Sequence, residues 1–487
     1  MLASRGGLTR ACAAIAFLLL PAAALHAEVL IRWDQNEIPS PVSLGISSVV
    51  VGAGKSALLR SALDQGYRVF VEVEGAALAR FVPPAGGIAG VVVKGKASPQ
   101  QLSALAQRLK AGTRIITLDD RGKWPHIRSN WVTRNKEVLQ VSSRSAQPWI
   151  ENNAALLRIM QASGVPELTK NLPARRSRPW ITYPWQPVTL SDVEDGPELE
   201  NYLVAIAEAG SFGGDLLLPL HERFQKDILL GLPRARDAWE QIRRHVAFYS
   251  WDLPARYQPI ANIGVVTAAP EAWFEVMNLL SRHNLPFALI APARLSAAAV
   301  AHLDLLIVLD RPGPAQLGIL AAFAQKGGAV VVDTAAAAGS SASARGPARP
   351  WSSLTPVLRS GDRVSYRVGE GRVVEVLKGI PDPNAFALEM RELLGREHRA
   401  IDIWNGITVI TAGYKDPAGG SLLVTAVNYA HQPLPVQLRV AGRFSLVQYE
   451  SPDEPATLLP YQQRDGYTEF VLPALTIGAR IFLSQSP

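Results

Sequence analysis

Apolar runs and helical periods alternate along the first half of the chain. Eight runs rich in β-branched residues predict strands at residues 29–33, 47–51, 68–73, 88–93, 114–118, 138–141, 180–183 and 215–218. Most of these runs are continuously apolar, as in parallel strands that are buried on both faces. The pattern therefore predicts a (β/α)8-type barrel over residues 28–252, with an open doubly wound sheet as the alternative.

Helix signals lie between several of these strands. The clearest is at Ser98, which can cap a helix, with Pro99 suited to the first helical position and Gln101 able to complete a capping box. An amphipathic stretch over residues 223–250 is expected to close the barrel.

The second half of the chain divides into two further patterns. Residues 260–358 repeat strand and helix, with helices expected at 272–282 and 314–325, which predicts a flavodoxin-like α/β domain. Residues 360–487 alternate short strands with turn signals, which predicts an antiparallel β-sandwich. The fold class is therefore α/β, with three domains in this order.

The first 27 residues are typical of a secretory signal peptide. A positively charged start precedes an apolar run over residues 11–20, and small residues follow Pro21 up to Ala27. We therefore expect cleavage near Ala27 and export to the periplasm or the extracellular space. The run is too short to serve as a stable membrane anchor, which needs about 20 apolar residues.

Composition excludes several kinds of chemistry. The only cysteine, Cys12, lies inside the predicted signal peptide, so the exported chain would have no disulfide, thiol nucleophile or cysteine-bound metal. The run VGAGKS at 51–56 lacks the first glycine of a phosphate-binding loop. A net charge of +7 without a basic stripe carrying interleaved aromatics argues against nucleic acid. We expect no cofactor and no metal.

Two stretches, LDLLIVLD (303–310) and AAFAQKGGAVVVDT (321–334), resemble the trimerisation domain of glycoside hydrolase family 42 β-galactosidases. VGEGRVVEV (368–376) and SLLVTAVNYAHQPLPVQLRV (421–440) resemble segments before and within the terminal sandwich of the same family. The resemblance covers about half the chain. It implies a glycosidase-like barrel that acts on oligosaccharides, and self-association into a homo-oligomer through the second domain.

The family's two catalytic glutamates have no counterparts here. The resemblance places an acid/base glutamate, after an asparagine, at the end of the fourth strand and a nucleophilic glutamate at the end of the seventh. Lys94 follows the fourth predicted strand, or Asp119 and Asp120 if the first strand is not counted. Pro184 or Pro219 takes the later position. A noncatalytic glycan-binding or scaffold protein with a degenerate barrel therefore stays open beside the glycosidase.

Acids at strand ends are the catalytic candidates, because barrel enzymes place reacting groups there and glycosyl transfer uses a carboxyl pair. Asp119 and Asp120 come first, with helix capping and pairing to Arg121 as the alternative. Glu72 is the third candidate, and an ion pair between Lys94 and either Glu72 or Glu74 is the competing interpretation.

Substrate contacts are expected from polar and aromatic residues near the same strand ends, because sugar rings stack on aromatic side chains. These candidates are Asp34, Glu74, Lys94, Trp124, Trp131, Tyr183 and Trp185. Residues 121–136 read as one long basic loop, which would suit an anionic sugar such as a uronate or would simply be solvated.

Overall fold

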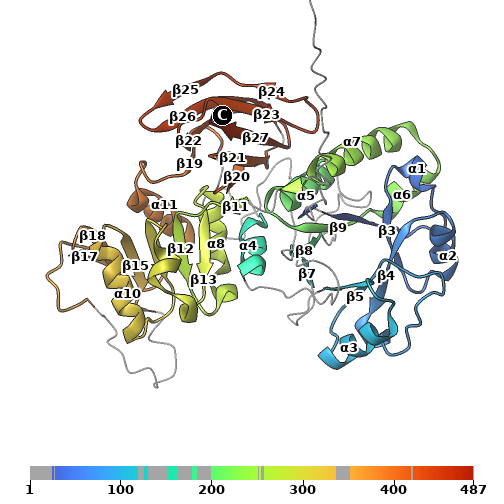
Figure 1. Ribbon diagram of the computed structural model, residues 1–487, viewed down its shortest axis with the longest axis horizontal. Coiled ribbons are helices and arrows are strands. Elements are labelled where there is room, and N and C mark those ends of the chain that lie inside the picture. Colours follow the sequence, from blue (N-terminus) through green and yellow to red (C-terminus); the bar gives the residue numbers. More distant parts are fainter. Residues whose placement is uncertain are drawn as a thin grey trace, which may run out of the picture.

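The computed structural model describes residues 25–26, 28–118, 126–129, 152–162, 178–183, 199–250, 252–253, 257–335, 351–417, 420–430 and 432–485. Three units are seen in Figure 1: a barrel on the right, a mixed sheet on the left and antiparallel sheets above them. Among the described residues, no helix combines the length and apolar composition needed to cross a bilayer.

Eight parallel strands close into a barrel in chain order. They are β2 (Val29–Arg32), β3 (Ser48–Gly52), β4 (Arg68–Glu74), β5 (Gly90–Lys94), β6 (Arg114–Leu118), β7 (His126–Ser129), β8 (Trp180–Thr182) and β9 (Asp215–Pro219). The closed barrel is confirmed and the open sheet is excluded.

One barrel strand differs from the prediction. We expected the sixth at residues 138–141, which lie outside the described residues, but β7 (His126–Ser129) pairs with both β6 and β8 in this place. The expectation of one uninterrupted loop over 121–136 is therefore wrong. The sequence HIRS contains no apolar run, so its hydrophobic pattern does not predict a strand. It is a strand because its backbone pairs with both neighbouring strands.

The helical elements of this unit connect and cover the barrel strands. They are α1 (Pro41–Leu44), α2 (Ser56–Asp64), η1 (Gly75–Ala77), α3 (Pro99–Arg108), α4 (Ala154–Ala162), α5 (Leu199–Ser211), α6 (Glu222–Leu229) and α7 (Pro233–Tyr249). Ser98 and Gln101 form the expected capping box of α3. Two short strands, β1 (Leu25–His26) and β10 (Asp252–Leu253), pair with each other.

The second unit is a seven-stranded mixed sheet in the order β13-β12-β14-β15-β18-β17-β16. Its strands are β12 (Ile263–Val266), β13 (Phe287–Ile290), β14 (Leu305–Val308), β15 (Ala329–Asp333), β16 (Leu358–Ser360), β17 (Arg363–Val368) and β18 (Gly371–Val376). Its helices are η2 (Pro270–Trp273), α8 (Phe274–Arg282), η3 (Pro292–Arg294), α9 (Ala297–Val300), α10 (Pro314–Gln325) and α11 (Pro383–Leu394).

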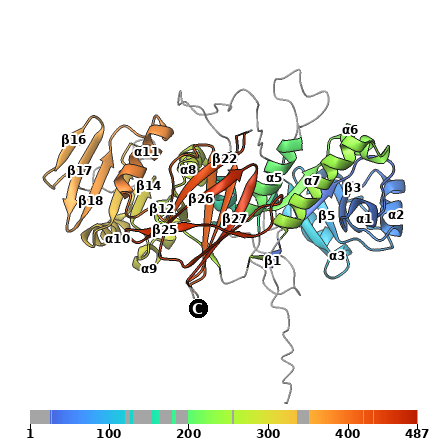
Figure 2. The ribbon, with the colours of Figure 1, turned by 90° about the horizontal axis from the view of Figure 1, so that it is seen from above.

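The predicted boundary at residue 360 is corrected by this sheet. We expected β17 and β18 to belong to the terminal antiparallel unit, but β18 pairs with β15 in parallel and carries β17 and β16 as an antiparallel edge. Figure 2 shows these strands at the end of the molecule away from the barrel. Alternation alone could not separate a sheet's antiparallel edge from a new antiparallel unit.

The third unit consists of a six-stranded and a four-stranded antiparallel sheet that share one apolar core. Their strands are β11 (Gln258–Pro259), β19 (Ile401–Ile403), β20 (Val409–Lys415), β21 (Leu422–Asn428), β22 (Leu434–Ala441), β23 (Leu446–Glu450), β24 (Thr457–Leu458), β25 (Tyr461–Arg464), β26 (Tyr467–Leu475) and β27 (Gly478–Ser484).

The three units pack directly on one another. Helix α4 lies between the barrel and the mixed sheet (Figure 1), and its Arg158 donates to the carbonyl oxygen of Phe287. The hydroxyl of Tyr414, from β20, donates to the carbonyl of Ser211 at 2.6 Å. The barrel is thereby fixed from two sides.

Candidate functional site

The interior of the barrel is filled by one ring of apolar side chains. Seven strands contribute one residue each to a separate buried cluster: Leu30, Val50, Phe70, Val92, Ile116, Trp180 and Leu217. Because neighbouring residues of a strand point to opposite sides, residues two positions further along point inward too, at the carboxyl ends of the strands. That end is where barrel enzymes carry their active sites.

Charged side chains form the layer above this ring. Arg32 and Glu72 stand two residues beyond Leu30 and Phe70, and their side chains form an ion pair at 3.0 Å, from Nη2 to Oε1. The same guanidinium reaches Asp34, with Nε 3.6 Å from Oδ2. One arginine therefore bridges two carboxyls at the barrel mouth.

The shared guanidinium limits the distance between the two bridged carboxyls. Both contacting oxygens lie within 4 Å of it. The two carboxyls are therefore at most about 9 Å apart, which does not exceed the largest separation of glycosidase carboxyl pairs, about 9.5 Å. Asp34 and Glu72 are thus close enough to be candidates for such a pair.

Glu72 is the buried member of the group, with 9% of its surface exposed. Burial raises the pKa of its carboxyl, Arg32 and Lys94 oppose that rise, and the neighbouring carboxylates Asp34 and Glu74 add to it. A raised pKa keeps a carboxylic acid protonated closer to neutral pH, which a general acid needs.

Glu74 and Lys94 lie at the rim. They are directly opposite each other on β4 and β5 and form an ion pair at 3.6 Å. Their side chains are 63% and 48% exposed, so solvent or a ligand can reach both. The predicted ion pair of Lys94 is confirmed with Glu74 as the partner.

The loop that carries Asp34 is held by a buried side chain. Gln225, from α6, accepts from the backbone N–H of Asp34 at 2.7 Å and of Gln35 at 3.2 Å. Its amide nitrogen donates to the carbonyl of Leu220 at 2.7 Å. Gln225 is fully buried, so it acts as a positioning residue for Asp34.

Tyr183 does not belong to this site, which corrects our prediction. Trp180 points into the barrel, so Thr182 shares its direction and Tyr183 points outward. Tyr183 is fully buried and donates to Glu208 of α5 at 2.8 Å. Glu208 also accepts from both nitrogens of Asn153 at 2.6 Å and from the hydroxyl of Tyr429, so this cluster ties the barrel to the antiparallel sheets.

The remaining predicted site residues lie outside the described residues. These are Asp119, Asp120, Trp124, Trp131 and Trp185. Asp119 and Asp120 directly follow β6 in the chain. The described residues contain no group of three His, Cys, Asp or Glu side chains placed to hold a metal ion.

Sequence reasoning missed Arg32 and Gln225. Arg32 had a signal: it is the one charged residue in the apolar run VLIRW, two positions from Leu30 and on the same side of the strand. Gln225 had no such signal, since its partner Asp34 is 191 residues away in the chain.

The fold is that of a multidomain protein built on a parallel eight-stranded barrel, and it matches solved glycoside hydrolases. α-L-Fucosidase isoenzyme 2 from Paenibacillus thiaminolyticus matches with a TM-score of 0.59 and 9% identity, over 95% of this chain and 100% of that one. At this identity the match shows a shared fold and does not show a shared activity or substrate.

β-Galactosidases, among them a family 42 enzyme, match more distantly. The cold-adapted β-galactosidase from Rahnella sp. R3 has a TM-score of 0.49 and 11% identity, over 93% of this chain and 99% of that one. A catalytic mutant of Gan42B from G. stearothermophilus has a TM-score of 0.44 and 9% identity, over 80% and 66%. Likeness at this level supports no argument about function. No protein-family model matches the sequence, and no curated protein does.

Proposed function

We propose that this protein is an exported glycoside hydrolase that cleaves oligosaccharides at the mouth of its barrel. The observation that carries the proposal is Glu72, an almost buried carboxyl of raised pKa, joined through Arg32 to the second carboxyl of Asp34. The fold shared with an α-L-fucosidase is consistent with such an activity.

In this proposal Glu72 is the general acid that protonates the leaving-group oxygen. The second carboxyl is Asp34, or one of Asp119 and Asp120, and it activates water or attacks the anomeric carbon. Glu74 and Lys94 at the rim would bind hydroxyls, and Trp124, Trp131 and Trp185 would stack on sugar rings. Arg32 would hold the acid in place and stabilise the second carboxyl as an anion.

The finer architecture belongs to the same proposal. We interpret the mixed sheet as a flavodoxin-like domain that mediates self-association, and the two antiparallel sheets as a β-sandwich. Export would follow cleavage near Ala27.

The test is hydrolysis and binding of neutral and acidic oligosaccharides by the full chain and by Glu72→Gln. We expect Glu72→Gln to lower kcat by 10²-fold or more, because general acid catalysis contributes about 10²–10⁴-fold. Above the pKa of Glu72 the rate of the unsubstituted protein should fall, since the acid must be protonated to act. Glu240→Gln on α7 is the matched control, because its carboxylate pairs with Arg243 of the same helix, outside the barrel.

The alternative is a noncatalytic glycan-binding protein, which the absence of the family's two glutamates favours. Binding without turnover of any oligosaccharide, unchanged by Glu72→Gln, would favour this alternative. Equal kcat in Glu72→Gln and Glu240→Gln would exclude Glu72 as the acid.

A further inference from the structure

A concave surface lies outside the barrel, at the seam between the mixed sheet and the antiparallel sheets. It encloses about 260 Å³ and is lined by the end of α8, by α11 and by the turn after β19. Small-molecule pockets begin at about 300 Å³, so this open groove is smaller than a typical pocket and suits one ring of a longer ligand.

A tryptophan stands exposed at the edge of this groove. Trp404 keeps 39% of its surface in solvent, and Ile407 (73%) and Leu388 (41%) lie beside it in the lining. Arg396 places its guanidinium 5.0 Å from the centre of the Trp404 ring. An aromatic ring with an adjacent cation offers a stacking surface and a charge at one point.

The turn that presents Trp404 is held by hydrogen bonds to β22. The side chain of Asn405 donates to the carbonyl of Pro435 and accepts from the N–H of Gln437, both at 2.8 Å. The N–H of Trp404 donates to the carbonyl of Gln437 at 3.3 Å. Trp404 therefore lies on a turn of fixed conformation, so ligand binding would lose less conformational entropy there.

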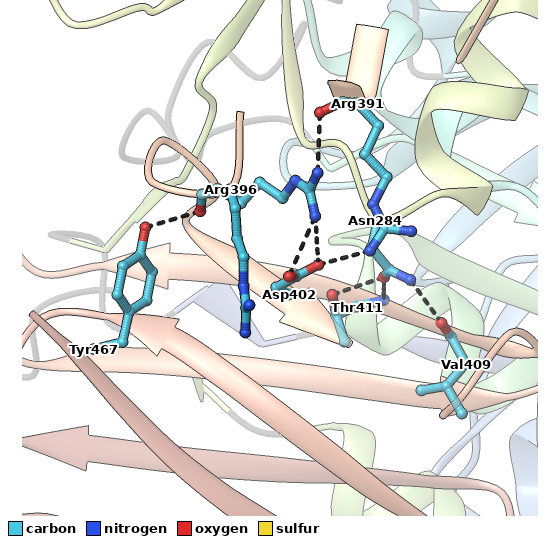
Figure 3. A network of polar contacts seen from close by, with 8 residues as sticks. Asn284, Arg391, Arg396, Asp402, Val409, Thr411 and Tyr467 are labelled. Atoms are coloured by element: carbon cyan, nitrogen blue, oxygen red, sulfur yellow. Dashed lines mark hydrogen bonds and ion pairs between the residues drawn. The ribbon is translucent and has the colours of Figure 1, made fainter. Parts of the chain in front are cut away.

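The floor of the groove is fixed as well. Asn284, in the left-handed backbone region at φ 55°, accepts from the N–H and the hydroxyl of Thr411 at 2.7 and 2.8 Å. It donates to the carbonyl of Val409 at 2.9 Å. Figure 3 shows Asn284, Thr411, Asp402 and Arg391 close together, although they come from the turn after α8, from β20, from β19 and from α11.

The charge of the groove is positive. Arg282 and Arg391 are among its lining residues, and no carboxylate is. The buried Asp402 beneath it pairs with two arginines, Arg391 at 2.7 Å and Arg399 at 3.3 Å, so one negative charge is set against two positive ones. Arg396 beside Trp404 adds a further cation.

Two acids near the groove, Glu389 and Glu397, are directed elsewhere. Glu389 of α11 pairs with Arg363 at 3.1 Å, and Glu397 lines a different cavity. That other cavity is larger, about 480 Å³, but it combines Asp304 and Glu397 with Lys326 and His398. Its aromatic residue, Phe323, is only 9% exposed, so it offers neither an open ring nor one sign of charge.

We propose that this groove binds an anionic saccharide, with a sugar ring on Trp404 and a carboxylate or sulfate of the sugar at Arg396 and Arg391. A neutral sugar would not use the positive charge of Arg396 and Arg391, and an anion without a ring would leave the tryptophan uncovered. The site does not depend on the chemistry proposed for the barrel, and it would anchor the protein on an acidic polysaccharide.

The test is affinity electrophoresis of the full chain at 0.15 M salt, a salt level that limits nonspecific charge attraction. The gels contain polygalacturonate, its methyl-esterified form, polyglutamate or dextran. We expect retardation in polygalacturonate only. Trp404→Ala should weaken it about fivefold or more, as loss of an aromatic stack does, and Arg396→Gln should weaken it as well.

Matched controls come from β25, where an exposed aromatic and an exposed arginine are close in sequence. Tyr461 is 37% exposed and the side chain of Arg464 is 75% exposed. Tyr461→Ala and Arg464→Gln remove the same groups and should keep the retardation. Ile407→Glu places a carboxylate at an exposed rim position without disturbing a core, and it should abolish binding even if Trp404→Ala folds poorly.

Three outcomes would overturn the proposal. The first is equal retardation of the Trp404→Ala and Tyr461→Ala variants. The second is equal retardation in esterified polymer or in polyglutamate, which would show that the charge or the sugar ring is not recognised. The third is unchanged binding by Ile407→Glu. Because Glu72→Gln alters only the barrel, its retardation should equal that of the unsubstituted chain whether or not the barrel is catalytic.

Discussion

The two ends of the barrel carry ionic clusters of similar composition but different surroundings. At the amino-terminal end, Glu28, Arg114, Arg178 and Asp215 are all largely buried. Asp215 accepts from the N–H of Glu28 at 2.9 Å and pairs with Arg178 at 3.2 Å. Arg114 pairs with Glu28 and lies 5.4 Å from the ring centre of Trp180.

At the carboxyl-terminal end, Arg32 pairs with Asp34 and Glu72, and Glu74 pairs with Lys94. The second pair is the more exposed of the two groups and lies at the rim. The lower cluster closes the barrel with ion pairs between its own buried groups. The upper cluster leaves Glu74 and Lys94 open to a ligand. Charged residues inside this barrel therefore indicate a candidate ligand site only at the end where they remain accessible.

The largest expected difference in the free energy of unfolding is between substitutions of Arg114 and of Lys94. Arg114→Met should lower the free energy of unfolding by about 3–5 kcal/mol, because it leaves the carboxylate of Glu28 buried without its partner. Lys94→Met at the opposite end should change it by less than about 1 kcal/mol, because its pair with Glu74 is solvent-exposed. Urea denaturation of both variants measures the contrast, and equal losses would contradict it.

The lower cluster should also give stability a pH dependence. Burial raises the pKa of Asp215 from 3.8 to about 6, although Arg178 opposes the rise. The folded state then binds the proton more tightly than the unfolded state. The contribution of Asp215 to the free energy of unfolding is therefore greatest below pH 3.8. It falls by about 3 kcal/mol as the pH rises from 3.8 through about 6.

Urea denaturation between pH 4 and pH 7 measures this effect. Asp215→Asn cannot ionise at this position and should show a shallower decline over that range. A decline identical to that of the unsubstituted protein would assign it to other groups.

Gln225 supports the upper cluster from outside the barrel. Gln225→Leu would leave the N–H groups of Asp34 and Gln35 and the carbonyl of Leu220 without this partner, and should cost about 2 kcal/mol of stability. It should also lower kcat by releasing Asp34. Gln65→Leu, which removes the hydrogen bonds of an exposed glutamine to the carbonyl of Ile38 and the hydroxyl of Ser61, is the control. A loss of stability with unchanged kcat would show that Gln225 is only structural.

The smallest expected effect on stability is that of Glu74→Gln. Its pair with Lys94 is worth less than about 1 kcal/mol at this exposure. The same change removes a negative charge that raises the pKa of Glu72. The alkaline limb of the pH–rate profile should therefore move to lower pH, and an unmoved limb would indicate that Glu72 is not the titrating acid.

Local signals in the sequence predicted much of the fold. The capping residues Ser98 and Gln101 and the helix over residues 314–325 are where the pattern placed them. Seven of the eight barrel strands also overlap their predicted ranges, because a buried strand is visible in the sequence as an apolar run. The polar strand β7 had no such run and was misplaced.

The candidate site was predicted less completely. Strand-end position identified Asp34, Glu72, Glu74 and Lys94, since the carboxyl ends of parallel strands meet at one edge. It could not show that Tyr183 points outward, because that depends on which residue of β8 faces the interior.

The sequence by itself determined the barrel, the order of the units and the acids at the strand ends, because hydrophobic period and chain order are local properties. Only the tertiary structure decided that Arg32 bridges Asp34 and Glu72, that Gln225 holds Asp34, and that β16–β18 extend the mixed sheet. These contacts depend on side-chain direction and on the pairing of distant segments, which no local pattern of residues encodes.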